Sequence, residues 1–253
     1  MKQHHAFSLV ELSIVLVILG LLVGGILAGQ SLIRASELRA VSTEFHRYST
    51  AFNAFRDKYF VLPGDMANAT SFWGTAANCP GTSAQGSTTQ ATCNGNGNNI
   101  IYPSTNSIEH FRAWQHLANA GLIEGNYSGV SGPDDSTSDS LLGINVPQSK
   151  LSSAGWSIRH NVSGIDVFTP SGIHIFSFGG DAADGTQTSK PTTLTPEEAW
   201  NIDTKLDDGF PPLGKVMAFR TGCTNGSSTS DLNATYVLST KTKVCSLYFI
   251  RPF

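Results

Sequence analysis

The chain has 253 residues, a formal net charge of −3 and only 14% charged residues. A nearly balanced charge without a basic run excludes the kind of surface that phosphate groups require, so we expect no nucleic-acid partner. The length fits one globular domain with an appendage, or two small domains. Four cysteines, in a chain rich in Ser, Thr, Asn and Gly, indicate an oxidising compartment outside the cytoplasm.

An apolar segment begins close to the N-terminus. Residues 6–28 contain a single charged side chain, Glu11, and the run is long enough to span a bilayer as a helix, which needs roughly 20 residues. One interpretation is a conventional secretory signal that is cut after Ala28. Glu11 argues against this, because a carboxylate at the centre of a bilayer costs on the order of 2.5–3.5 kcal/mol and a simple signal has no use for it.

The run AFSLVELSIVLVILGLL, from Ala6 to Leu22, resembles the N-terminal signature of type IV pilins and type II secretion pseudopilins. In that family a prepilin peptidase removes a short leader on the cytoplasmic side, and the new N-terminus is methylated. The matching scissile bond joins Ala6 to Phe7, so the resemblance implies N-methylated Phe7 and places Glu11 fifth in the mature chain. Two positions depart from the usual pattern: Ala6 stands where Gly is usual, and no proline lies near the end of the apolar run.

The same resemblance gives Glu11 a role in assembly. In a filament of this family the apolar helices bundle together away from lipid, and the carboxylate pairs with the positively charged N-terminal amine of a neighbouring subunit, here at Phe7. An unpaired charge in such a bundle is costly, so the pair fixes the register between subunits. The implied partners are the prepilin peptidase and methyltransferase, other pilin or pseudopilin subunits, and inner-membrane lipid before assembly.

The helix is predicted to continue beyond the apolar segment. Apolar residues recur at alternating spacings of three and four, while charged residues, Glu44 among them, occupy the other positions. Pro63-Gly64 then ends the pattern. A helix from Phe7 to Leu62 would be roughly 84 Å long at about 1.5 Å per residue. The apolar stripe consists of Leu38, Val41, Phe45, Tyr48, Phe52, Phe55, Tyr59 and Leu62.

The stripe has two interpretations, a two-stranded coiled coil or a face that packs on a β-sheet of the same chain. Four aromatic residues among its eight positions favour packing on the sheet. We therefore divide the chain into a prepilin leader (1–6), a transmembrane and assembly helix (7–28), an amphipathic continuation of that helix (29–62) and a globular pilin-like domain (63–253).

The globular part contains signals for both helices and strands. A short helix is predicted over 107–121 with Ser107 as its N-cap. A second helix is predicted with Thr195 as its N-cap and Pro196 at its first position. Glu198 completes the capping box, and the helix is predicted to stop at Gly209. Residues 75–99 and 125–140 are polar loops. Alternation and β-branching predict strands at 156–159, 165–169, 173–178, 215–220, 235–238 and 244–250.

Three carboxylates lie near the end of the second helix, where the helix dipole disfavours negative charge: Asp203, Asp207 and Asp208. One explanation is a bound cation such as calcium, which some pseudopilins carry in their C-terminal loops. The other, which we favour, is that these carboxylates accept backbone N–H bonds or pair with Lys215 or Arg220. We therefore assign no metal.

Four cysteines allow three disulfide connectivities. The pairs Cys79–Cys93 and Cys223–Cys245 close the shortest loops, so we predict that pattern. The second loop resembles the disulfide-bounded region of type IV pilins. A loop of 15 residues such as 79–93 gains about 3 kcal/mol from closure in the chain-entropy model.

No catalytic motif or phosphate loop is present, and His110 and His116 fall on different helix faces, so we predict neither an enzyme nor a cofactor. The predicted fold is α+β and pilin-like, with a long N-terminal helix on an antiparallel sheet and disulfide-bounded loops. We predict a structural subunit of a type IV pilus or type II secretion pseudopilus, held in the bacterial inner membrane with a periplasmic domain before it joins the filament or reaches the cell surface. The alternative is a secreted or membrane-anchored binding module, for example for carbohydrate, behind a conventional signal.

Overall fold

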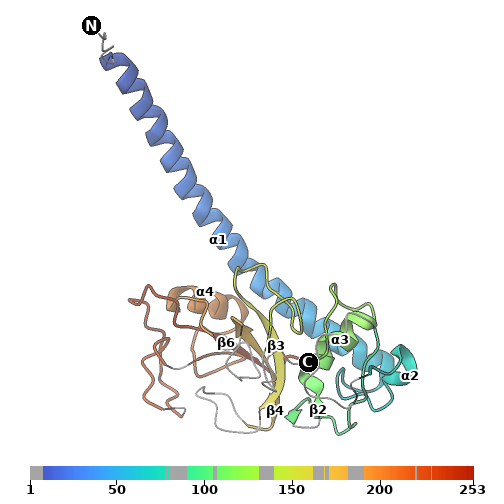
Figure 1. Ribbon diagram of the computed structural model, residues 1–253. Coiled ribbons are helices and arrows are strands. Elements are labelled where there is room, and N and C mark those ends of the chain that lie inside the picture. The colour runs from blue at the N-terminus through green and yellow to red at the C-terminus, as the bar shows by residue number, and fades with distance from the viewer. Residues whose placement is uncertain are drawn as a thin grey trace.

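The chain folds as one long helix attached to an α+β body, in a computed structural model that describes residues 8–77, 79, 90–104, 107–130, 140–161, 168, 171–181, 191–219, 221–228 and 230–253. The first half of helix α1 (Leu9–Tyr59) projects from the body as a rod, and its second half lies along the body (Figure 1). A four-stranded antiparallel sheet completes the body. The predicted pilin-like α+β architecture is confirmed.

Helix α1 ends at Tyr59, three residues before the predicted end at Leu62. Phe60 takes the left-handed conformation with φ 58°, and its N–H donates to the Arg56 carbonyl at 2.8 Å. The chain must turn here because Leu62 precedes a proline, which disfavours the helical conformation. Gly64 then approaches the next helix so closely, at φ 88°, that a Cβ would lie 2.2 Å from the Glu109 carbonyl oxygen.

Within the described residues, three short helices accompany α1: α2 (Thr70–Trp73), α3 (Glu109–Asn119) and α4 (Pro196–Leu206). Ser107 does not cap α3 as predicted, because it pairs with Ser104 in the small hairpin of β1 (Pro103–Ser104) and β2 (Ser107–Ile108). Ile108 takes the cap position without a side-chain hydrogen bond. The predicted capping box of α4 is confirmed, with the Thr195 hydroxyl accepting from the Glu198 N–H at 3.3 Å.

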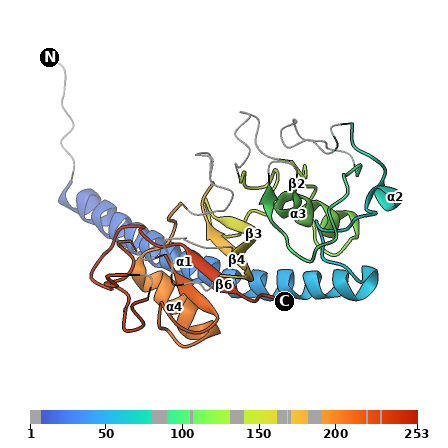
Figure 2. The ribbon, with the colours of Figure 1, turned by 90° about the horizontal axis from the view of Figure 1, so that it is seen from below.

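The main sheet has the order β3-β4-β6-β5, with every pair antiparallel. Its strands are β3 (Gly155–Asn161), β4 (Ile173–Gly179), β5 (Val216–Ala218) and β6 (Leu247–Ile250). The register places Trp156 opposite Phe178, and Phe176 opposite Phe249. The face that carries these four rings meets α1, because Phe45 of the helix stacks on Trp156 and Phe249. Figure 2 shows α1 lying along the sheet.

Two of the six predicted strands, 156–159 and 173–178, match β3 and β4, and the predictions at 215–220 and 244–250 contain the shorter β5 and β6. Most of 165–169 lies outside the described residues. The prediction at 235–238 is wrong, because this segment forms only an isolated bridge from Tyr236 to Thr224. The segment lies beside the loop at residue 224, which the Cys223–Cys245 disulfide holds in place. Because this loop is not a strand, it cannot continue the backbone hydrogen bonds of a sheet.

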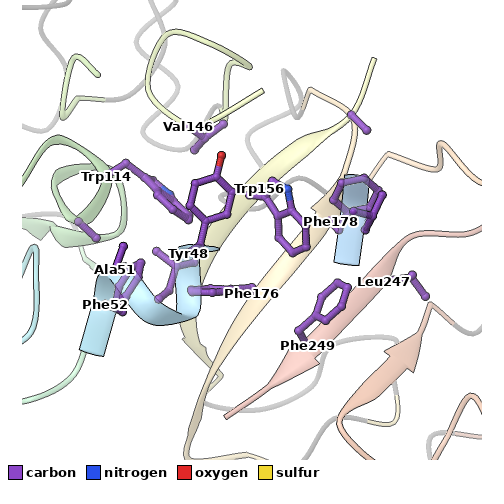
Figure 3. Packing of buried hydrophobic residues seen from close by; sticks show 14 of the residues in the cluster. Tyr48, Ala51, Phe52, Trp114, Val146, Trp156, Phe176, Phe178, Leu247 and Phe249 are labelled. Carbon is purple, nitrogen blue, oxygen red and sulfur yellow. The ribbon is translucent and has the colours of Figure 1, made fainter. Parts of the chain in front are cut away.

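The core lies between the amphipathic half of α1, α3 and the sheet, and it is largely aromatic (Figure 3). The Phe45 ring stacks on Phe249 at 4.7 Å between centroids, and Phe52 packs against Phe176 at 5.2 Å. Tyr48 meets Trp114 edge-on at 5.1 Å. The apolar stripe of α1 therefore packs on the chain's own sheet, as predicted, and each fully buried ring contributes about 1.5–3 kcal/mol.

One charged residue of α1 lies inside this core. The sequence placed Glu44 among the polar positions, but its side chain is 6% exposed. Its carboxylate accepts three hydrogen bonds, from the Ser149 hydroxyl at 2.6 Å, the Trp156 indole N–H at 2.8 Å and the Lys150 backbone N–H at 2.8 Å. Glu44 lies three residues after Val41 and four before Tyr48, so it shares their face, and the three donors make its burial possible.

Replacing this carboxylate tests its part in holding α1 on the sheet. We expect Glu44→Ala to lower the free energy of unfolding by about 2–4 kcal/mol, because it leaves the buried donors of Trp156 and Ser149 without their acceptor. Urea unfolding of the full chain in detergent, followed by tryptophan fluorescence, measures the change. Asp57→Ala, at an exposed position of the same helix, should stay within about 0.5 kcal/mol of the parent. Equal midpoints for the two variants would contradict the prediction.

Candidate assembly site

The apolar half of α1 is a continuous exposed surface. Every Leu, Ile and Val side chain from Leu9 to Ile33 is more than half exposed. Among the described helices, α1 has the length and composition needed to cross a membrane, and its most apolar stretch is not buried anywhere in the molecule. Such a surface is stable only when lipid or other helices cover it.

The described chain begins at Ser8, which is the N-cap of α1. Its hydroxyl accepts from the Val10 N–H at 3.3 Å, and the Glu11 carboxylate accepts from the Ser8 backbone N–H at 2.8 Å. This reciprocal capping box places the carboxylate in the first turn, where the helix dipole favours negative charge. The Ser-x-x-Glu spacing of residues 8 and 11 is the sequence signal for this capping box, although none was predicted there.

The cleavage and methylation positions, Ala6 and Phe7, lie outside the described residues. Their roles therefore remain predictions. The pairing of Glu11 with the amine of a neighbouring subunit is a contact between chains, and it too remains a prediction. What the structure adds is that Glu11 has an acceptor role within its own helix.

An ion pair joins α1 to α4 just beyond the apolar half. The Arg34 guanidinium donates through Nε to the Glu198 carboxylate at 2.6 Å and through Nη2 at 2.9 Å, and it also contacts Glu37 at 3.1 Å. Glu198 accepts from the Thr195 N–H as well, so one carboxylate caps α4 and binds α1. Partial burial alone would raise the pKa of Glu198, but the hydrogen bonds from Arg34 and Thr195 hold it below its usual value.

The three carboxylates at the end of α4 lie together, with ligand atoms within 4.8 Å of one another. Each accepts hydrogen bonds from the chain itself. Asp207 accepts from the backbone N–H groups of Lys215 and Val216, and Asp208 accepts from the Phe210 N–H at 2.8 Å. The favoured interpretation, that these groups accept backbone N–H bonds, is therefore what the structure shows; the Lys215 side chain is not the partner, and Arg220 lies outside the described residues.

Asp203 is the buried member of this group. Its carboxylate accepts from the Tyr236 hydroxyl at 2.8 Å and from the Gly209 N–H at 3.2 Å. Burial raises the pKa of Asp203 to about 7, and the nearby negative charges of Asp207 and Asp208 act in the same direction. The two hydrogen bonds work against this rise without cancelling it.

The four cysteines form the disulfides Cys79–Cys93 and Cys223–Cys245, the pattern with the shortest loops. The second disulfide holds the 223 loop against the residues that lead into β6. At the opposite end of the body, Asp65 organises the loop at 94–99 by accepting from the Asn98 and Asn99 N–H groups at 3.0 and 2.8 Å.

The two histidines of α3, His110 and His116, are buried in the body. The His116 Nδ1 accepts from the Gly64 N–H at 2.9 Å, and its Nε2 lies 3.0 Å from the Thr92 hydroxyl. Burial lowers the pKa of both His110 and His116 to about 3, so both rings are neutral at pH 7. Their surroundings are those of structural side chains.

The first turn of the rod-like apolar helix holds Glu11 in a capping box, and the helix continues into an α+β body. This architecture defines a pilin-like protein. Comparison with known families supports this description, since residues 1–27 match the prokaryotic N-terminal methylation motif. The chain therefore carries the prepilin signature of type IV pilins and pseudopilins, and the matched residues include Glu11 and most of the apolar half. No curated protein and no solved structure matches the chain.

The raised pKa of Asp203 gives a prediction for stability against pH. In the unfolded chain this carboxyl has its ordinary pKa near 3.8, so between that value and about 7 the folded state binds more protons than the unfolded state. The stability that Asp203 contributes is therefore complete at acid pH and falls as the pH rises through about 7, by at most about 1.4 kcal/mol per pH unit.

Asp203→Asn should remove this dependence. We expect the difference in urea midpoint between the variant and the parent chain to shift in favour of the variant as the pH is raised from 4.5 to 8. Asp208→Asn, which removes an exposed carboxylate from the same turn, controls for the loss of one negative charge. Parallel pH curves for Asp203→Asn and the parent would show that Asp203 titrates alike in the folded and unfolded chains.

Proposed function

We propose that the protein is a structural subunit of a type IV pilus or a type II secretion pseudopilus, without enzymatic activity. The observation that carries the proposal is the exposed apolar half of α1, joined to the methylation motif at one end and to a folded body at the other. A helix of this kind serves as a membrane anchor before assembly and as part of the buried helix bundle of a filament afterwards.

The division of the chain follows from that proposal. Residues 1–6 are the leader that a prepilin peptidase removes, 7–28 the transmembrane and assembly helix, 29–62 the amphipathic segment and 63–253 the globular domain. We infer that the domain lies in the periplasm before assembly, and its two disulfides agree with an oxidising compartment. Other pilin or pseudopilin subunits replace lipid around α1 when the filament forms.

Glu11 provides the chemical reason for a change of partners. In lipid its carboxylate is partly satisfied by the Ser8 N–H of its own helix, which is a single hydrogen bond to a neutral donor. A neighbouring N-terminal amine offers a positive charge in the same apolar setting, where an ion pair gains far more than in water. Assembly therefore replaces a weaker interaction with a stronger one.

The mature N-terminus tests the class of protein. In a host that contains a prepilin peptidase, we expect intact mass and N-terminal sequencing to show a chain that starts at N-methylated Phe7. A start at Gly29 would remove the whole assembly helix, and it would leave a secreted binding domain behind a conventional signal instead.

The charge on Glu11 tests the mechanism of assembly. Glu11→Gln keeps an acceptor for the Ser8 N–H but removes the charge, and we expect it to lower the yield of filaments by more than about tenfold, because losing one partner of a buried ion pair costs about 3–5 kcal/mol. Processing at Phe7 should be unchanged. Ser31→Ala, another polar position on the exposed part of α1, should assemble normally. Normal filaments from Glu11→Gln would assign Glu11 to helix capping alone.

A further inference from the structure

Phe60 occupies a position that folding alone does not explain. It is the C-cap of α1 in the left-handed conformation, with φ 58°, where glycine is the usual residue. Its ring is 90% exposed, so it adds no burial that would offset the strain. Phe72 is 55% exposed and packs edge-on against Tyr59 at 5.4 Å. We call Tyr59, Phe60 and Phe72 the aromatic tip.

A cleft of about 280 Å³ lies at the other end of the body, between α4 and the segment 235–238. Three of its apolar side chains are exposed: Trp200 at 39%, Phe210 at 50% and Leu238 at 42%. The Tyr236 side chain lies in its wall, held by the hydrogen bond of its hydroxyl to Asp203. The cleft therefore offers apolar walls on a fixed support, which suits one inserted aromatic ring.

The two features lie at opposite ends of the body along α1. α2 and the end of α1 are at one end, and α4 is at the other, in both views of the molecule (Figures 1 and 2). α4 meets α1 at Arg34, which is 26 residues (60 minus 34) before Phe60, or roughly 39 Å along the helix at about 1.5 Å per residue. A copy shifted along α1 by this length brings its tip level with the start of α4 in the next copy, and α4 is the helix that forms one wall of the cleft.

The charges beside the two features are of opposite sign. Arg56 and Lys58 flank the tip together with Asp57, which leaves one net positive charge, and the Lys58 ammonium lies 5.1 Å from the centroid of the Tyr59 ring. Among the described residues, Asp208 is the one charged residue that lines the cleft, and its side chain is exposed. Approach of a tip to a cleft is therefore electrostatically favourable, whereas tip to tip and cleft to cleft are not.

We propose that Phe60 of one copy of this chain inserts into the Trp200–Phe210–Leu238 cleft of a second copy. This proposal rests on the proposed function, because such a contact joins different patches and repeats head to tail, as a helical filament requires. It adds a contact between bodies to the bundle of apolar helices. The exposed, strained phenylalanine then has its reason in the assembled state.

Phe60→Gly separates assembly from folding. Glycine adopts the left-handed conformation without strain, so the variant should unfold at the same or a higher urea concentration than the parent. Its filaments, sheared from cells and measured relative to the membrane-bound pool, should fall several-fold in yield. Ile144→Ser removes a 54% exposed apolar side chain outside both features and should leave the yield unchanged.

Engineered cysteines test the contact itself. In filaments of the double variant Phe60→Cys and Leu238→Cys, oxidation should give a ladder of covalent multimers on a non-reducing gel, because all four native cysteines are already paired. The matched control pairs Ile144→Cys with Leu238→Cys and should give monomers.

The possible outcomes distinguish the contact, the identity of its occupant and the proposed function. Filaments that form without a ladder, or with the same ladder in the Ile144→Cys control, overturn the contact and leave the proposed function intact. Cross-linking of Leu238→Cys to a different protein overturns the second copy as the occupant of the cleft. Absence of filaments from the unaltered chain in a competent host overturns the proposed function, and the contact with it.

Discussion

The packing of one face of α1 on the four-stranded sheet is the contact on which the rest of the molecule depends. The helix supplies a whole layer of the core, so neither layer could bury its apolar face without the other. Glu44 fixes this contact in one position, because its carboxylate accepts from Trp156 on the sheet and from the loop at 149–150. The direction of the apolar half follows, since α1 is a single helix from Leu9 to Tyr59.

Local and periodic features could be predicted from the sequence. The stripe of α1, the capping box at Thr195 and the α+β class depend on residues that are near one another in the chain, and these predictions hold. Glu44 was misplaced because its burial depends on donors more than 100 residues away, at Ser149 and Trp156. Ser107 could have capped a helix, but pairing with Ser104 placed it in a hairpin instead.

The candidate site shows the same division. The motif around Glu11 could be found because it is a short, contiguous pattern, and the Ser8–Glu11 box is another that was open to the same method. The Arg34–Glu198 pair could not, because no local pattern relates a residue in α1 to one 164 positions later. Glu198 illustrates how such a contact arises, since a carboxylate already oriented by its own helix cap is available to a second donor.

The attachment of α1 at Arg34 also determines where the molecule can stretch. Four of the ten residues from 20 to 29 are glycines, each about 1 kcal/mol less favourable in a helix than alanine, and no side chain packs against them in the single chain. A pull along the rod therefore unwinds this stretch before it disturbs the body. Ten residues that pass from about 1.5 to about 3.3 Å of rise each lengthen the chain by roughly 18 Å, so the glycines make the last turns of the apolar half an extensible section next to the body.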